Sequence, residues 1–319
     1  MNYMLLIIGF YLLIKGADLF VDGASSIAKK LKVPSILIGL TIVAFGTSAP
    51  EAAVSINAAL KNSSGIVVGN IVGSNIFNLL IVIGIASIIH PIDIKLNTIV
   101  KEFPFMLLAT IVLYILGNDI IFQDSMVNRL SVGDGLIILS VFAVFLYYLI
   151  EMAFLSKEAQ IESSDGDGKV LNIYTSLLWG VLGLGGILFG SDLVVKNSTV
   201  IALRFGMSET LVGLTIVAIG TSLPELITSI VAARKGEGDI AIGNVIGSNL
   251  FNILFILGVS SVIGTVFVEA KILLDILFLL VITIITYYFA ITKKAFNRYE
   301  GIILTLTYII YMIYIIKRN

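Results

Sequence analysis

The sequence predicts an all-α membrane protein with ten transmembrane helices arranged as two inverted five-helix repeats. Three observations lead to this fold class. Of the 319 residues, 58% are hydrophobic and only 13% are charged, which is about half the charge of an ordinary soluble domain. Apolar stretches recur with the length of about 20 residues that a helix needs to cross a bilayer. Finally, two long motifs return at one fixed distance along the chain, which indicates an internal duplication.

The apolar stretches divide the chain into ten predicted spans with one hydrophilic segment between the fifth and the sixth. The spans lie near 3–26, 33–59, 66–90, 98–117, 133–154, 171–196, 207–233, 240–265, 268–290 and 299–316. We therefore predict a first five-helix repeat at 1–155, a linker at 156–170 and a second repeat at 171–319. Because five is an odd number of crossings, the second repeat enters the membrane from the opposite side.

The basic residues predict the orientation of these spans. With the N-terminus outside, twelve lysines and arginines fall on the inner side and seven on the outer side. Inner loops of membrane proteins carry an excess of such residues. We expect both termini outside the cell membrane and the 156–170 linker in the cytoplasm.

The composition also limits the chemistry. The chain has no cysteine and a single histidine, His90, so disulfides and thiolate chemistry are excluded and a metal ion would need oxygen ligands. The net charge is −1, which gives no reason to expect a nucleic-acid partner. We expect no enzymatic activity and no cofactor.

Two blocks of sequence recur after 174 residues. IGLTIVAFGTSAPE at 38–51 matches VGLTIVAIGTSLPE at 212–225 in eleven of fourteen positions, and GNIVGSNIFN at 69–78 matches GNVIGSNLFN at 243–252. Each copy places a carboxylate, hydroxyls and amides inside apolar sequence. Such groups are costly in a membrane, so two matched sets predict a functional polar site.

The first block predicts a broken helix beside a carboxylate. Pro50 cannot donate a backbone hydrogen bond, so the helix should break or kink there. A break at membrane depth is tolerated where its carbonyls line a cavity or meet a ligand. Thr47 and Glu51 are four residues apart and share a helix face, with Ser48 close to it. The second copy repeats the pattern with Thr221, Ser222, Pro224 and Glu225.

The second block adds polar side chains at helical spacing. Ser74 and Asn78 are four apart, as are Ser248 and Asn252, so each pair lies on one helix face. Brought together at a pseudo-two-fold axis, the four segments supply two carboxylates, hydroxyls, amide oxygens and freed carbonyls. Calcium takes six to eight oxygen ligands, and sodium is of similar size, so this set of oxygens could hold either ion.

GTSAPE with GNIVGSNIFN, and GTSLPE with GNVIGSNLFN, resemble the paired signature repeats of the cation/calcium exchanger superfamily, especially its prokaryotic sodium/calcium exchangers. The resemblance covers both halves and the central loop. It implies ten helices in two inverted repeats, with alternating access around a midplane site. The ligands that it implies are Glu51 and Glu225 at the centre, flanked by Thr47, Ser48, Thr221, Ser222, Ser74, Asn78, Ser248 and Asn252, with backbone carbonyls from Ala44 and Ala218.

The chain departs from some family members at Asn252, where they carry aspartate, so its motif holds two carboxylates rather than three. We expect a secondary antiporter that exchanges cytoplasmic Ca²⁺ for external Na⁺, working as a monomer in the lipid bilayer. Two alternatives stay open. Protons could replace sodium, because burial favours the neutral form of a carboxyl group, or the glutamates could line a cation channel. The five-span halves argue against the channel, and an intramembrane hydrolase lacks a nucleophile–base pair.

Overall fold

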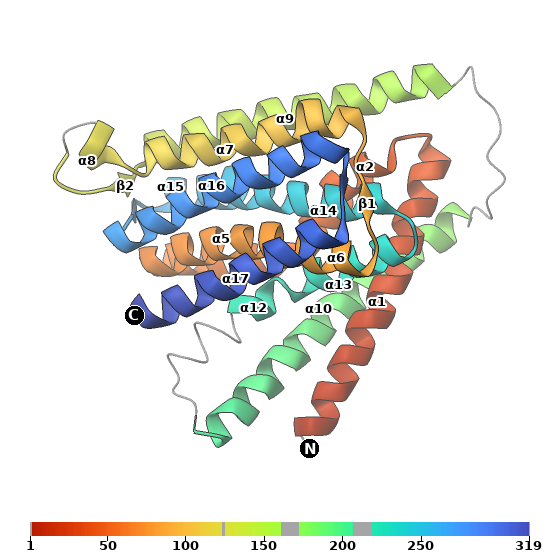
Figure 1. The fold of residues 1–319 in the computed structure, drawn as a ribbon, viewed down its shortest axis with the longest axis horizontal. Coiled ribbons are helices and arrows are strands. Elements are labelled where there is room, and N and C mark those ends of the chain that lie inside the picture. The colour runs from red at the N-terminus through yellow and green to blue at the C-terminus, as the bar shows by residue number, and fades with distance from the viewer. Residues whose placement is uncertain (1, 123–124, 161–171, 207–217, 319) are drawn as a thin grey trace.

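The computed structural model describes residues 2–122, 125–160, 172–206 and 218–318, and within them the chain is a bundle of long helices (Figure 1). Eight of the described helices are long and apolar enough to cross a membrane, and Ser35–Thr47 with Ala49–Leu60 forms a ninth candidate bent by 52°. The seventh predicted span, 207–233, lies partly on 207–217, outside the described residues. The chain is therefore a multi-span helical membrane protein.

The first half, as far as 160, follows the predicted order of spans. Its elements are α1 (Asn2–Leu31), α2 (Ser35–Ile38), η1 (Gly39–Val43), α3 (Ala44–Thr47), α4 (Ala49–Leu60), α5 (Ser64–Phe77), η2 (Asn78–Val82), α6 (Ile83–Ile89), β1 (Ile92–Asp93), η3 (Thr98–Glu102), α7 (Phe103–Leu116), α8 (Asp119–Phe122), β2 (Arg129–Leu130) and α9 (Val132–Gln160). Helix α9 runs five residues into the predicted linker, and the rest of that linker, 161–170, lies outside the described residues.

The described part of the second half contains α10 (Ile173–Arg204), α12 (Ala218–Thr221), α13 (Leu223–Arg234), α14 (Gly238–Leu250), η5 (Phe251–Leu257), α15 (Gly258–Ile263), β3 (Val266–Phe267), α16 (Ala270–Lys293), β4 (Ala295–Phe296) and α17 (Arg298–Arg318). The η segments are π-helical turns, which often mark functional sites in helices. Segments η2 and η5 continue α5 and α14 in corresponding places of the two halves.

Local backbone conformations also recur at the 174-residue offset. Lys32 ends α1 with φ 54°, and Gly206 follows α10 with φ 84°. Asn62 follows α4 with φ 56°, and Gly236 follows α13 with φ 76°. A residue in the left-handed region commonly terminates a helix. The duplication therefore extends from the motifs to the turns between helices.

Two short antiparallel sheets join loops that are far apart in sequence. Strand β1 pairs with β4, with Ile92 opposite Phe296, and β2 pairs with β3, with Leu130 opposite Val266. The first sheet ties the loop after α6 to the loop after α16. The second ties the loop before α9 to the loop before α16.

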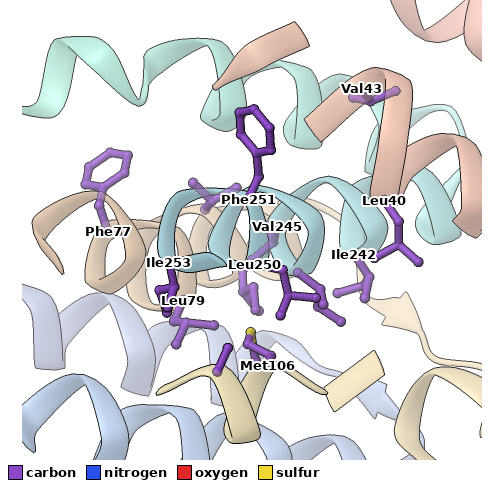
Figure 2. Packing of buried hydrophobic residues seen from close by; sticks show 14 of the residues in the cluster. Leu40, Val43, Phe77, Leu79, Met106, Ile242, Val245, Leu250, Phe251 and Ile253 are labelled. Atoms are coloured by element: carbon purple, nitrogen blue, oxygen red, sulfur yellow. The ribbon is translucent and has the colours of Figure 1, made fainter. Parts of the chain in front are cut away.

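The two helices that carry GNxxGSN lie at the centre. In the spans Ser64–Ile89 and Gly238–Ile263, 83% and 89% of the most apolar window is buried inside the protein, against 39% or less in the other single-helix candidates. Figure 2 shows the packing around them, where side chains of α5, η1, η2, α7, α14 and η5 meet, among them Leu79, Met106, Leu250 and Ile253. Apolar contacts thus surround the helices on which the polar motifs lie.

Helices α1 and α10 run side by side as a separate pair, red and green in Figure 1. They approach so closely that a Cβ atom placed on Gly183 would lie 2.5 Å from the backbone nitrogen of Phe20. Small residues allow such an approach between helices in membranes. At one end, α1 also contacts the α13–α14 connection, where Ser25 donates a short hydrogen bond to Glu237 and Lys235 pairs with Asp22 at 2.8 Å.

Candidate functional site

Both helix breaks that the sequence predicts are present, and each lies two residues before its proline. Ser48 separates α3 from α4 with φ −81° and ψ 8°, and Ser222 separates α12 from α13 with φ −94° and ψ 7°. Pro50 and Pro224 then stand in the first turn of the new helix, where their missing N–H has no helical partner to lose. Each break therefore begins a helix whose first turn carries a glutamate.

The two glutamates are buried and linked across the two copies. Glu51 is 0% exposed and Glu225 is 1% exposed. Ser48 Oγ donates to Glu225 Oε1 at 2.9 Å, and Ser222 Oγ donates to Glu51 Oε1 at 2.9 Å. Each carboxylate also lies in the first turn of its helix, where the helix dipole favours negative charge. The exchange of equal bonds brings the two GTSxPE motifs into one site.

The serines of the second motif complete the same exchange. Ser74 Oγ donates to Glu51 Oε1 and Ser248 Oγ donates to Glu225 Oε1, both at 3.5 Å. Ser222 Oγ lies 3.1 Å from Ser74 Oγ. Each glutamate oxygen that accepts these bonds is thus bonded by a serine of its own copy and a serine of the other.

Four buried oxygen atoms of the predicted ligands have no hydrogen-bond donor among the described residues. They belong to Glu51 (Oε2), Glu225 (Oε2), Asn78 (Oδ1) and Asn252 (Oδ1). Buried acceptors without a donor are rare in folded proteins and destabilise them. No described lysine or arginine forms an ion pair with either glutamate. The site therefore offers oxygens and negative charge to a cation.

The remaining predicted ligands are Thr47, Thr221 and the backbone carbonyls of Ala44 and Ala218. Thr47 is fully buried and donates to Ala44 O at 3.3 Å, and Ser248 Oγ also donates to Ala44 O at 3.4 Å. Thr221 ends α12 beside Ser222. Ala218 begins α12 in the backbone, while its side chain lies outside the described residues.

Sequence reasoning missed an outer layer of hydrogen bonds around the glutamates. Asn70 Nδ2 donates to Ser55 Oγ at 2.9 Å and to the backbone oxygen of Glu51 at 3.3 Å. Asn244 Nδ2 makes the same two bonds, to Ser229 Oγ at 2.9 Å and to the backbone oxygen of Glu225 at 3.3 Å. A signal was present in the sequence, because 70, 74 and 78 are spaced by four residues and so share one helix face.

Hard oxygen ligands of this kind suit Ca²⁺ and Na⁺. The described residues contain no group of three or more His, Cys, Asp or Glu side chains that could hold a metal ion. An ion at the centre would accordingly meet two carboxylates and otherwise neutral hydroxyl, amide and carbonyl oxygens. Two ionised carboxylates carry the charge that balances one divalent cation.

Buried carboxylates at the centre of a multi-span helical protein are typical of membrane ion transporters. The family model described as sodium/calcium exchanger protein matches residues 1–151 and 175–317. The chain belongs to this family, the cation/calcium exchangers, whose members are transporters and not enzymes.

Individual relatives agree with the family. The sodium/calcium exchanger MaX1 of Methanosarcina acetivorans is 32% identical over 98% of this chain and 97% of its own length. The inner membrane protein YrbG of Escherichia coli is 36% identical over 81% of this chain and 79% of its own. A solved structure of the sodium–calcium exchanger NCX_Mj, soaked with 10 mM Na⁺ and 10 mM Sr²⁺, superposes with a TM-score of 0.83 at 32% identity, covering 97% of this chain and 96% of that chain.

Proposed function

We propose that this chain exchanges cytoplasmic Ca²⁺ for external Na⁺ across the cell membrane by alternating access at a midplane site formed by Glu51 and Glu225. The observation that carries the proposal is the difference between the two oxygens of each carboxylate. One oxygen accepts a hydrogen bond from a serine of the other copy, and the second oxygen has no described donor. The first bond fixes the glutamate in place, and the second oxygen is left for an ion.

The proposed ligand set has two carboxylates at its centre and neutral oxygens around them. Asn78 and Asn252 supply amide oxygens that also lack a donor among the described residues. The flanking members are Thr47, Ser48, Thr221, Ser222, Ser74 and Ser248, with the carbonyls of Ala44 and Ala218. Calcium matches the charge of the two glutamates, and sodium ions can take the same oxygens.

The mechanism follows from competition for these oxygens. Two ionised glutamates without a cation leave buried charge uncompensated, which is expensive. A site loaded with Ca²⁺ or with Na⁺ compensates that charge, so the loaded protein can close and reopen on the other side. An empty site resists closure. Because the ions share the glutamates, binding of one kind displaces the other, and this couples the two fluxes.

We further propose that the chain forms two inverted five-helix repeats, 1–155 and 171–319, with the 156–170 linker in the cytoplasm and both termini outside. The pairing of loops supports this arrangement. With ten alternating crossings, the β1 and β4 loops fall on one face of the membrane and the β2 and β3 loops on the other, and each observed sheet joins loops of a single face. The paired serine–glutamate bonds support a two-fold relation between the repeats.

Reconstituted vesicles test the exchange. Wild-type protein should take up ⁴⁵Ca²⁺ when a sodium gradient is imposed, and Glu51→Gln and Glu225→Gln should each abolish uptake, because glutamine keeps the size but removes the charge. Glu151→Gln, which removes an exposed carboxylate from α9, is the matched control and should transport normally. Near wild-type exchange by either site variant would refute the site. Uptake driven by a pH gradient and not by sodium would favour the proton-coupled alternative.

The orientation has its own test, since the chain contains no cysteine. A single cysteine introduced into the linker should be protected in intact cells from a membrane-impermeant maleimide and should react after permeabilisation. A cysteine next to the C-terminus should react without permeabilisation. The reverse pattern would overturn the orientation while leaving the ion site untouched.

A further inference from the structure

We propose that Asn75 and Asn249, which the ion site does not use directly, are positioning residues that turn the carboxamide oxygens of Asn78 and Asn252 toward the ion. This inference deepens the proposed function and rests on it. It concerns four asparagines, Asn75, Asn78, Asn249 and Asn252, which we call the four-asparagine cluster. All four side chains are 1% exposed or less.

The cluster is built from two hydrogen bonds that cross between the central helices. Asn78 Nδ2 donates to Asn249 Oδ1 at 3.1 Å, and Asn252 Nδ2 donates to Asn75 Oδ1 at 3.2 Å. Asn75 lies three residues before Asn78, and Asn249 lies three residues before Asn252. Each helix therefore offers one acceptor and one donor on the same face. The helices α5–η2 and α14–η5 are thereby joined at the point where their π-helical turns begin.

These bonds determine which atom of each carboxamide is free. A carboxamide has an NH₂ donor group on one side and an oxygen acceptor on the other. When the NH₂ group of Asn78 or Asn252 is bonded across the helix interface, its oxygen must point the other way. Both of these oxygens are among the four buried oxygens of the predicted ligands that have no described donor. If Asn75 or Asn249 did not accept, the carboxamide could rotate and present N–H groups, which repel a cation.

The two positioning residues are not held equally. Asn249 Nδ2 lies 3.7 Å from Met106 Sδ on α7 as a weak donor contact, whereas Asn75 Nδ2 has no partner among the described residues. Asn75 can therefore rotate by 180° and donate if its partner becomes an acceptor. This asymmetry makes the role of Asn75 testable with nearly isosteric changes.

The first experiment measures Ca²⁺ binding to purified protein by isothermal titration calorimetry. Asn75→Leu removes the acceptor at similar volume and should raise the Ca²⁺ dissociation constant roughly tenfold, the loss expected for one buried hydrogen bond. Asn75→Asp keeps an acceptor at the same place and should bind Ca²⁺ at least as well as the wild type. A merely structural role would make both variants similar to the wild type in Ca²⁺ affinity, or lower both equally.

The second experiment tests the pairing itself with equal charge. In the double variant N78D/N249D, two carboxylates face each other across the interface with no donor between them. In the control N249D/N252D the same number of carboxylates is present, but position 249 still accepts from Asn78 and position 252 faces Asn75, which can rotate to donate. The facing pair should bind Ca²⁺ at least about tenfold more weakly than the control, because each unmade charged hydrogen bond costs that much or more.

The outcomes separate this inference from the proposed function. Wild-type affinity in Asn75→Leu, or equal affinity in the two double variants, would overturn the positioning role and leave exchange intact. Wild-type protein that binds Ca²⁺ in the calorimeter but does not exchange it in vesicles would overturn the proposed function alone. Wild-type protein that binds no Ca²⁺ would overturn both.

Discussion

The polar centre and the α1–α10 pair join the two copies of the duplication in different ways. At the centre, Ser48 and Ser222 bond the glutamate of the other copy, each at 2.9 Å. Between α1 and α10 the backbones themselves are in contact, and an added Cβ atom on Gly16 would lie 2.7 Å from Gly183 O. The polar centre is held by the direction of its hydrogen bonds. The α1–α10 pair instead needs residues small enough for the two backbones to touch. The two regions should therefore fail under different substitutions.

The largest expected effect is on the α1–α10 pair. Gly183→Ala places a methyl group 2.5 Å from Phe20 N and 2.7 Å from Gly16 O. These are backbone atoms of α1, which cannot move unless the helix moves. The helices must separate, which we expect to lower the stability of the folded protein by about 3 kcal/mol. Thermal unfolding in detergent, followed by size-exclusion chromatography, measures the loss.

Gly185→Ala is the matched control for this prediction. It lies on the same helix two residues away, is exposed, and an added Cβ atom meets nothing within 4 Å. Alanine is a better helix former than glycine, so this variant should keep or slightly raise the unfolding temperature. Equal destabilisation by the two variants would show that close packing between α1 and α10 is not what holds the pair.

The next effect breaks the centre and leaves the packing alone. Ser48→Ala and Ser222→Ala each remove a 2.9 Å hydrogen bond to a buried carboxylate. Bonds to charged groups contribute roughly 1.5–3 kcal/mol, so Ca²⁺ affinity should fall at least about tenfold in each variant. Because the two bonds have the same length and the same kind of acceptor, the losses of Ca²⁺ affinity in the two variants should agree within about threefold.

Calorimetric titration with Ca²⁺ measures these losses, and size-exclusion chromatography checks that the variants stay folded. Ser140→Ala serves as the control, since Ser140 is exposed and donates to Leu136 O on its own helix. A large loss in one variant and none in the other would contradict the two-fold correspondence of the centre.

We expect a smaller difference, in stability, at a position where the two copies are not equivalent. Asn70 and Asn244 make the same two bonds, but Asn244 is 0% exposed and also accepts from Thr47 at 3.0 Å, whereas Asn70 is part-buried. Water can replace the bonds lost in Asn70→Leu more easily than those lost in Asn244→Leu. The free energy of unfolding should therefore fall by about 1 kcal/mol more in Asn244→Leu than in Asn70→Leu. Parallel chemical denaturation of the two variants tests this difference.

Much of the centre could be predicted from the sequence because its two copies repeat the same local chemistry. The 174-residue offset located Glu51 and Glu225, and Pro50 located the break that the structure has at Ser48. Serines and asparagines spaced by four residues indicated which helix faces were polar. These features depend on neighbours along one helix, which a sequence displays directly.

Contacts between helices could not be predicted in the same way. The spacing of Asn70 gave its helix face but not its partner Ser55, fifteen residues earlier on another helix. The π-helical turns η1, η2 and η5 were missed, because no residue type in them is excluded from an ordinary α-helix. The pairing of β1 with β4 joins loops some 200 residues apart, and only the arrangement of the helices between them brings these loops together.

The smallest expected effect concerns charge on the α1–α10 pair. Lys196 bonds Asp192 one turn earlier on α10 at 2.8 Å, with side chains that are 72% and 47% exposed. Exposed ion pairs within a helix contribute no more than about 0.5 kcal/mol. Lys196→Gln should therefore leave the unfolding temperature unchanged within error and should not alter ⁴⁵Ca²⁺ uptake. Because salt screens exposed pairs, raising the ionic strength should not reveal a difference either. A clear loss of stability in this variant would mean that charge, and not only the close approach of the backbones at Gly16 and Gly183, holds α10 in place.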